Sequence, residues 1–299
     1  MAFLFVRWNV ERVAFTIPWV GKEIPWYALA FVAGFALGLW IVGKVWKHEK
    51  LKEEWYDSLF FYVFFATIIG ARLGHVLFYH PQHYFAHPIE IFKVWEGGLA
   101  SHGGTLGIII AIWLYSKKVT HKNMLWTFDR LVLPVGFVSA LIRIGNLMNS
   151  EIYGHPTTLP WGFEFIRSSE WHLPPINQLP CHPTQIYEAI CYAITSCICL
   201  WMYWKKDAYK QQGLIFGVFF IGIFLSRFCI EFFKENQVDF EKGMLLNMGQ
   251  LLSIPFILAG IWFTYKGLQE RRKSKNAAIK TNTSQLLERK DTKAQRRKR

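Results

Sequence analysis

The sequence lacks charge over unusually long stretches. Three segments contain no Asp, Glu, Lys or Arg at all: Tyr27–Gly43, Gly97–Ser116 and Gly243–Tyr265. A helix of roughly 20 apolar residues is enough to cross the hydrocarbon core of a bilayer. Because 52% of the 299 residues are also hydrophobic, the composition argues against a soluble globular domain. It predicts an all-α integral membrane protein.

Several motifs of common enzyme classes are missing as well. The chain has no Gly-rich loop ending in Lys-Ser/Thr, which excludes that kind of nucleotide site, and no G-x-S-x-G turn that would carry a nucleophile. The five cysteines form no pair with a histidine at the spacing of a zinc site. No internal repeat is visible, which weakens a transporter interpretation. We therefore expect no metal and no cofactor, and we expect any nucleophile to belong to a second substrate.

The apolar segments predict about seven membrane spans within a membrane domain at residues 1–270. Between the fourth and fifth spans, the proline-containing segment 147–181 is no simple helix, and we expect it to form a small extracytoplasmic cap. The basic segment 271–299 is expected to be a disordered cytoplasmic tail. The predicted spans lie near residues 27–46, 58–79, 97–116, 126–146, 183–204, 212–233 and 243–265.

Positive charge follows alternate spans. Segments 44–52, 117–122 and 205–210 each hold three or more lysines, and the tail carries a net charge of +10 out of +13 for the whole chain. The positive-inside rule then places the N-terminus outside and the C-terminus in the cytoplasm. A basic tail beside a membrane is attracted to anionic headgroups, so we expect the lipid bilayer, and no nucleic acid, to be its partner.

Ionisable side chains inside the spans are the most informative feature. A charge in hydrocarbon costs a few kcal/mol or more, so such groups pair, face a wet cavity or do chemistry. With four actual or potential cations among them, they predict a polar chamber that accepts an anion. The six groups are Arg72, His102, Arg143, Glu188, Arg227 and Glu231.

A polar motif ends the fourth span. Arg143, Asn146 and Asn149 are spaced by three and share a helical face if the helix persists, with Glu151 and Gly154 beyond it. Guanidinium binds phosphate oxygens in pairs, and amides complete the donor set. The alternative is an Arg–Glu pair buried for structure alone.

Two further motifs allow both a functional and a structural interpretation. His102 stands among four glycines, Gly97, Gly98, Gly103 and Gly104. It is suited to proton transfer, or it is a hydrogen-bonded histidine in a packing turn. Arg227 and Glu231 are four apart on one helical face; Arg227 either faces a phosphate or forms a purely structural pair with Glu231.

Taken together, the motifs resemble the bacterial prolipoprotein diacylglyceryl transferases over roughly Pro25–Thr264. The resemblance departs from the usual pattern at Ile142, at Ile223, where a tyrosine is often found, and at Lys234, where an arginine is usual. The matching elements are Arg143-x-Gly145-Asn146-x-x-Asn149-x-Glu151-x-x-Gly154, His102-Gly103-Gly104, His182 through Glu188, Arg227 through Phe233 and Met248 through Pro255.

The resemblance implies a transferase of lipoprotein biosynthesis in the bacterial cytoplasmic (inner) membrane. Such an enzyme moves the diacylglyceryl group of phosphatidylglycerol to the lipobox cysteine of a prolipoprotein signal peptide, with its active site toward the outer leaflet. It implies His102, Arg143 and Arg227 as catalytic residues. The implied substrate-binding and supporting residues are Tyr27, Arg72, Asn146, Asn149, Glu151, Gly154 and Glu231.

Two other classes of protein fit the same charges. A non-enzymatic membrane carrier of anionic lipid would use the same cationic chamber but would need access from both sides of the membrane. A structural membrane scaffold predicts that all the intramembrane arginines pair internally and that no cavity is open.

Overall fold

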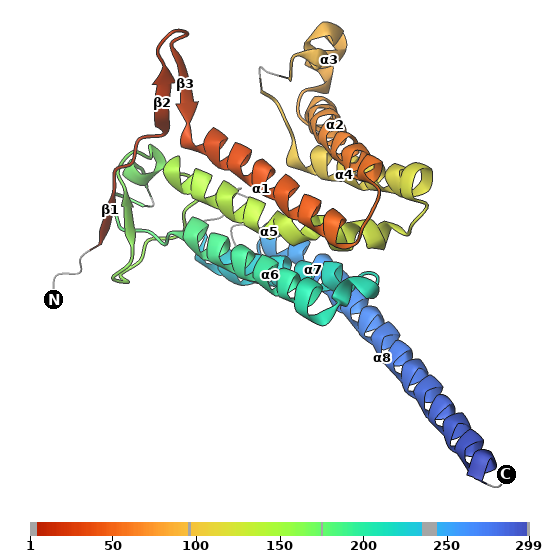
Figure 1. Cartoon of the computed structure of the whole chain (residues 1–299). Coiled ribbons are helices and arrows are strands. Elements are labelled where there is room, and N and C mark those ends of the chain that lie inside the picture. Colours follow the sequence, from red (N-terminus) through yellow and green to blue (C-terminus); the bar gives the residue numbers. More distant parts are fainter. Residues whose placement is uncertain (1–4, 95–96, 175, 235–243, 298–299) are drawn as a thin grey trace. The chain divides into compact units, whose positions relative to one another are not determined.

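The computed structural model describes residues 5–94, 97–174, 176–234 and 244–297, with side chains as far as residue 276 (Figure 1). The chain divides into two compact units. The first unit comprises Met1–Phe35 and Val135–Arg299, and the second comprises Ala36–Pro134. The long helices α1 and α5 contribute to both. The helices are α1 Trp26–His48, α2 Glu53–Phe78, α3 Pro81–Ala86, α4 Ser101–Tyr115, α5 Met124–Met148, α6 Thr184–Lys206, α7 Leu214–Ile230 and α8 Met248–Arg297.

The all-α membrane fold is confirmed by the length and composition of the helices. Six of them are long and apolar enough to span a membrane within the described residues: α1, α2, α5, α6, α7 with its 3-10 extension to Phe233, and α8 as far as Asn276. The predicted span near 97–116 is shorter, because α4 begins only at Ser101 and has 15 residues. Gly97 and Gly98, with φ of 91° and 69°, precede it in a non-helical conformation, and a π-helical turn, Ser116–Thr120, follows.

Glycines bring α2 and α4 into backbone contact in the second unit. A Cβ atom added to Gly103 would lie 2.2 Å from the carbonyl oxygen of Gly70 and 2.7 Å from the Cα of Gly74. One added to Gly107 would lie 2.3 Å from the carbonyl oxygen of Ala66. Small residues at a helix interface allow this close approach in membranes. The glycines beside His102 therefore seat its helix on α2.

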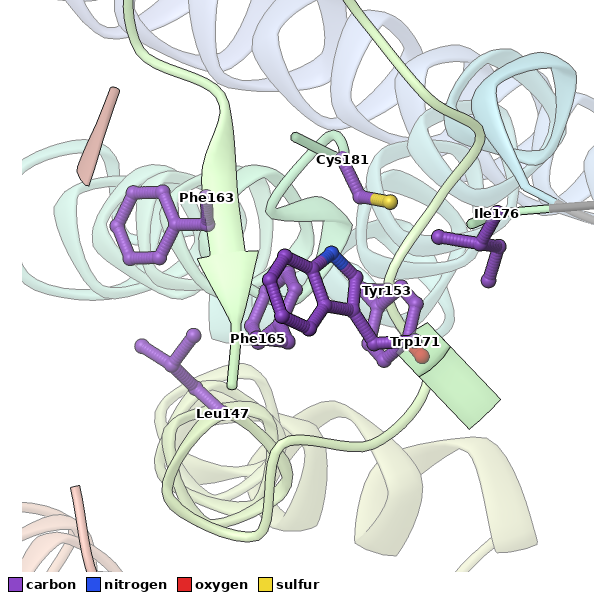
Figure 2. Close-up of a cluster of buried hydrophobic side chains, with 7 residues drawn as sticks. All are labelled: Leu147, Tyr153, Phe163, Phe165, Trp171, Ile176 and Cys181. Atoms are coloured by element: carbon purple, nitrogen blue, oxygen red, sulfur yellow. The ribbon is translucent and has the colours of Figure 1, made fainter. Parts of the chain in front are cut away.

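The cap expected at residues 147–181 has a hydrophobic core of its own (Figure 2). Strand β4 (Phe163–Phe165) pairs in parallel with β1 (Val6–Trp8), so the start of the chain is part of the cap. A separate hairpin, β2 (Val13–Ile17) with β3 (Lys22–Pro25), leads into α1. The sequence had predicted none of these short strands. The core residues are Leu147, Tyr153, Phe163, Phe165, Trp171, Ile176 and Cys181, with Trp8 packed against them.

The basic tail differs from the disordered segment that we expected. Helix α8 continues without a break to Arg297. Its sequence after Gly267 contains neither glycine nor proline and is rich in Lys, Arg, Gln, Leu and Ala, which are strong helix formers. Gly243, the expected start of the last span, and residues 298–299 lie outside the described residues.

Candidate active site

The polar side chains of the first unit gather where several helices begin or end. Tyr27 opens α1 and Arg143 lies in the last turns of α5, while Glu188 is in the second turn of α6 and Arg227 is near the end of α7. Since α1 and α6 begin where α5 and α7 end, the four side chains belong to the same end of the helical bundle. The lysines at positions 205 and 206 close the opposite end of α6.

Arg143 is held by a carboxylate that is fully buried. Its Nε lies 2.8 Å from Oε2 of Glu188, whose side chain is 0% exposed. Its Nη1 donates a long hydrogen bond of 3.4 Å to Oδ1 of Asn146, and the phenol of Tyr192 donates to the same Glu188 at 3.3 Å. The predicted shared face of Arg143 and Asn146 is thus present. The carboxylate that pairs with Arg143 is Glu188 on a different helix, however, and not a neighbour in its own motif.

Glu151 is bound by the two amides of the motif. Its Oε1 accepts hydrogen bonds from Nδ2 of Asn146 at 2.7 Å and from Nδ2 of Asn149 at 3.2 Å. Its backbone carbonyl accepts one from Nε2 of Gln185 at 2.6 Å. The carboxylate therefore orients both amides, and α6 fixes the turn in which it lies.

Gly154 is required by the approach of another backbone. A Cβ atom there would lie 2.1 Å from the carbonyl oxygen of Phe233, and the two segments form a β-bridge between Gly154 and Lys234. Gly154 also donates its N–H to the carbonyl of His182 at 2.9 Å. These contacts join the start of the cap to the segment that follows α7. They explain why position 154 is a glycine without any need for a bound ligand.

The predicted pair of Arg227 and Glu231 is replaced by a different arrangement. The carboxylate of Glu231 lies 3.6 Å from Nζ of Lys234, and Lys234 also lies 2.9 Å from Oε1 of Glu188. The side chain of Arg227 makes no hydrogen bond or ion pair with another described residue, although its backbone carbonyl accepts the N–H of Glu231. It is close enough to Tyr192 for both Arg227 and Arg143 to interact electrostatically with that phenol.

Sequence reasoning missed the part that Glu188 and Lys234 play. Glu188 was recognised as an intramembrane charge, but its position in the second turn of α6 does not reveal which cation it meets. Lys234 was noted as a departure from the family pattern and was given no role, yet it is only 5% exposed. The signal that would have found it is its place three residues after Glu231, one helical turn away.

Tyr27 packs against the motif of α5. A Cβ atom on Gly145 would meet Cδ2 of Tyr27 at 2.9 Å, so the ring covers the backbone between Arg143 and Asn146. At the entrance to α6, burial lowers the pKa of His182, and the nearby His155 adds to the effect. In the cap, burial raises the pKa of Tyr153 to about 12. Both side chains are therefore neutral near pH 7.

The second unit holds the other two predicted site residues, His102 and Arg72. His102 is the second residue of α4 and is exposed. Arg72 is buried, and its guanidinium donates to the backbone carbonyls of Ile91 at 2.8 Å, Gly97 at 2.7 Å, Gly98 at 3.2 Å and Glu90. It also lies over the ring of Tyr84. A cavity of about 450 Å³ adjoins it, lined by Arg72, His75, His80, His83, Tyr84, Glu90, Gly97 and Gly98.

The arrangement in the first unit suits an anion better than a metal. No group of three or more metal-ligating side chains occurs among the described residues. Arg143 is anchored at its Nε edge, Arg227 has no carboxylate partner in the described chain, and the amides of Asn146 and Asn149 lie beside them. A scaffold would pair all its arginines internally, and within the described residues the side chain of Arg227 has no such pair. The fold defines a helical membrane protein, and its site presents guanidinium and amide groups of the kind that suit an anionic group.

Comparison with known proteins identifies the family. A sequence model described as prolipoprotein diacylglyceryl transferase matches residues 12–266. The chain is 57% identical to the phosphatidylglycerol–prolipoprotein diacylglyceryl transferase of Porphyromonas gingivalis, over 89% of this chain and 95% of the relative. It is 40% identical to the protein of the same name from Chloroherpeton thalassium, over 91% and 98%. The chain therefore belongs to the prolipoprotein diacylglyceryl transferase family and is a membrane transferase, which confirms the predicted resemblance.

Proposed function

We propose that this transferase moves the diacylglyceryl group of phosphatidylglycerol onto the lipobox cysteine of a prolipoprotein. The sulfur forms a bond to the glyceryl carbon while the bond between that carbon and the phosphate oxygen breaks. The thiol proton passes to a base, and glycerol phosphate leaves with the electron pair of the broken C–O bond. The product is a thioether, formed in the first step of lipoprotein maturation.

The geometry of Arg143 is the observation that carries this proposal. Glu188 holds the guanidinium at Nε, 2.8 Å away, and only a 3.4 Å bond to Asn146 engages Nη1. The Nη edge therefore has donors to offer a phosphodiester. Fixed donors aimed at the oxygen where charge develops lower the barrier, because they need no reorganisation during the reaction. Phosphate is here both the bound group and the leaving group.

Arg227 supplies the second positive charge. Its charge and that of Arg143 both act on the phenol of Tyr192, which supports a role for both guanidiniums at one phosphate. Asn146 and Asn149, oriented by Glu151, would position the glycerol headgroup, with Gly154 and Tyr27 shaping the space around it. Glu231 would support this shell through its contact with Lys234. Arg72, a supporting residue in the second unit, would act there by holding the loop before α4 through its bonds to backbone carbonyls.

His102 is the group that we assign to the thiol proton, as a base or as an orienting residue. A free thiol has a pKa of about 8.5, so only a few per cent is thiolate at pH 7. A neutral histidine can accept the proton near neutrality. The exposed position of His102 at the start of α4 supports access for a second substrate.

The protein would act in the cytoplasmic (inner) membrane of a bacterium as a multi-pass enzyme. We place the N-terminus outside, the C-terminus in the cytoplasm and the active site toward the outer leaflet. Two observations support this: the site residues gather at one end of the helices, and lysines close the opposite end of α6. Signal peptides would then reach the site from the same leaflet as the lipid.

A mass measurement tests the reaction. Purified protein is mixed with phosphatidylglycerol and a peptide that carries the lipobox cysteine, and the same peptide with serine in its place is the control. We expect the mass of one diacylglyceryl group on the cysteine peptide alone, together with free glycerol phosphate. Movement of lipid without an adduct would instead support an anionic lipid carrier.

A further inference from the structure

Two cations share one buried carboxylate beside the proposed phosphate site. Oε2 of Glu188 faces Nε of Arg143 at 2.8 Å, and Oε1 faces Nζ of Lys234 at 2.9 Å. Tyr192 donates a further hydrogen bond of 3.3 Å to Oε1. Glu188 is 0% exposed and Lys234 is 5% exposed, so water screens neither contact strongly. The two oxygens of Glu188 are thus occupied by different partners.

Lys234 is held in this position from two directions. Its Nζ lies 3.6 Å from Oε2 of Glu231, and its backbone forms a bridge to Gly154. The adjoining N–H of His155 donates to the carbonyl of Phe233 at 2.8 Å. The backbone of Lys234 is therefore fixed at the junction between the cap and α7, and its ammonium is held between two carboxylates.

Sharing the carboxylate limits how Arg143 can bind to it. A free carboxylate and a guanidinium form a bidentate pair, in which two N–H groups meet two oxygens. Because Lys234 and Tyr192 both engage Oε1, Arg143 meets Oε2, and the contact is made through Nε. Without the charge of Lys234, Oε1 would keep only the 3.3 Å bond from Tyr192, and the guanidinium could turn an Nη donor toward it.

We infer that Lys234 is a positioning residue for the transfer reaction, because it prevents Glu188 from forming a bidentate pair with Arg143. The Nη edge of Arg143 is thereby kept for the lipid phosphate. This inference rests on the proposed role of Arg143 as a phosphate clamp. The positioning by Lys234 should affect the KM for phosphatidylglycerol more than kcat.

The first test compares Lys234→Met with Lys234→Arg. We expect Lys234→Met to raise the KM for phosphatidylglycerol by about tenfold or more while kcat changes less, and Lys234→Arg to bring KM back toward wild type. Lys210→Met is the matched control, because Lys210 is exposed and pairs with Asp207 at 3.0 Å. An unchanged KM for phosphatidylglycerol in folded Lys234→Met would overturn the inference.

The second test removes the shared carboxylate. In a Glu188→Gln background there is no carboxylate to share, so adding Lys234→Met should leave the KM for phosphatidylglycerol as it is in Glu188→Gln alone. The double variant should also have a lower KM than Lys234→Met. A further rise in KM in the double variant would mean that Lys234 acts on its own. The comparison of the double variant with Glu188→Gln can be made even if the single Lys234→Met variant does not fold. The double variant loses one charge of each sign, so no buried carboxylate is left without its cation at this pair.

The failure of the inference and that of the proposed function give different results. If the wild-type protein forms no adduct, the proposed function is wrong. If the wild-type protein forms the adduct and Arg143→Lys loses it, while the Lys234 variants keep a wild-type KM, only the positioning role is wrong.

Discussion

Each unit holds an intramembrane arginine, buried Arg72 or half-buried Arg143, and the two are satisfied in different ways. In the second unit, Arg72 donates to the backbone carbonyls of four residues that follow α3. In the first unit, Arg143 contacts a carboxylate that it shares with Lys234. A ring of carbonyls uses up the donors of a guanidinium and fixes a loop. A shared carboxylate fixes one edge of the guanidinium and leaves the other edge for a ligand.

The same substitution in both units tests this difference most sharply, and Arg143→Lys gives the larger effect. Lys cannot bind two phosphate oxygens at once, and one lost charge-assisted bond in a shielded site costs about 2.7–4 kcal/mol, or roughly a hundred- to a thousand-fold in kcat. We expect adduct formation by Arg143→Lys to fall by this factor, with little change in Tm. Arg167→Lys, at an exposed arginine of the cap, is the control. Activity of Arg143→Lys within about threefold of wild type would show that positive charge alone suffices.

Arg72→Lys should lower stability more than activity, whereas Arg143→Lys should lower activity more than stability. A lysine cannot reach four carbonyls, and each hydrogen bond of a charged group that is not replaced costs about 1.5–3 kcal/mol. We expect a clear fall in Tm in detergent, with adduct formation by the folded fraction reduced by about tenfold at most. A loss of activity as large as that of Arg143→Lys, at unchanged Tm, would place Arg72 at the phosphate.

His102→Gln separates proton transfer from phosphate binding. If His102 takes the thiol proton, a contribution of about a hundredfold is typical of such catalysis, and a preformed thiolate at pH 9 should restore part of the activity. The measurement is the rate of adduct formation by wild type and variant between pH 6 and 9. An equal loss at pH 7 and pH 9 would mean that His102 acts by geometry.

His182, between the cap and α6, predicts a smaller effect of pH on stability. Burial lowers its pKa in the folded protein below the usual 6.5. The unfolded chain therefore binds more protons below pH 6.5, and stability is lost as pH falls from 6.5 toward the lowered value. Tm in detergent should fall over this window in wild type and fall less in His182→Gln. An equally steep fall in the variant would assign the pH effect to other groups.

The smallest effect is expected for the basic C-terminal end of α8, which contains neither Arg72 nor Arg143. Truncation after Glu270 removes the basic end of α8, whose attraction to anionic lipid is only about 1 kcal/mol per residue near the surface. Adduct formation by the truncated protein should stay within about twofold of wild type. A protein that inserts into the membrane and folds but forms no adduct would show that the tail takes part in catalysis.

The sequence predicted the helical membrane fold and the motif of α5 because both depend on local patterns. Uncharged runs of about 20 residues are read without knowing the tertiary structure, and the spacing of Arg143 and Asn146 is a property of one helix. The pairing of Arg143 with Glu188 could not be read in this way. It joins two helices, and no spacing along the chain specifies which intramembrane carboxylate meets which cation.

The short strands and Lys234 escaped prediction for related reasons. Strands β1 and β4 have three residues each, too few to show an alternating pattern, and they pair across more than half of the chain. Lys234 follows the last apolar residues after α7 and begins a polar segment whose composition is typical of a loop. Its burial depends on the bridge to Gly154, another contact between distant segments.

The strand pairing of the cap also has a consequence for how the protein is made. Trp8 donates from its indole to the carbonyl of Leu147, 139 residues later in the chain. At a synthesis rate of about 5–20 residues per second, roughly 7–28 s separate the appearance of the two partners. During that time the indole of Trp8 has no partner, and β1 must wait until β4 (Phe163–Phe165) has also been made. The cap therefore cannot assemble before more than half of the chain has been synthesised, although it contains some of the first residues.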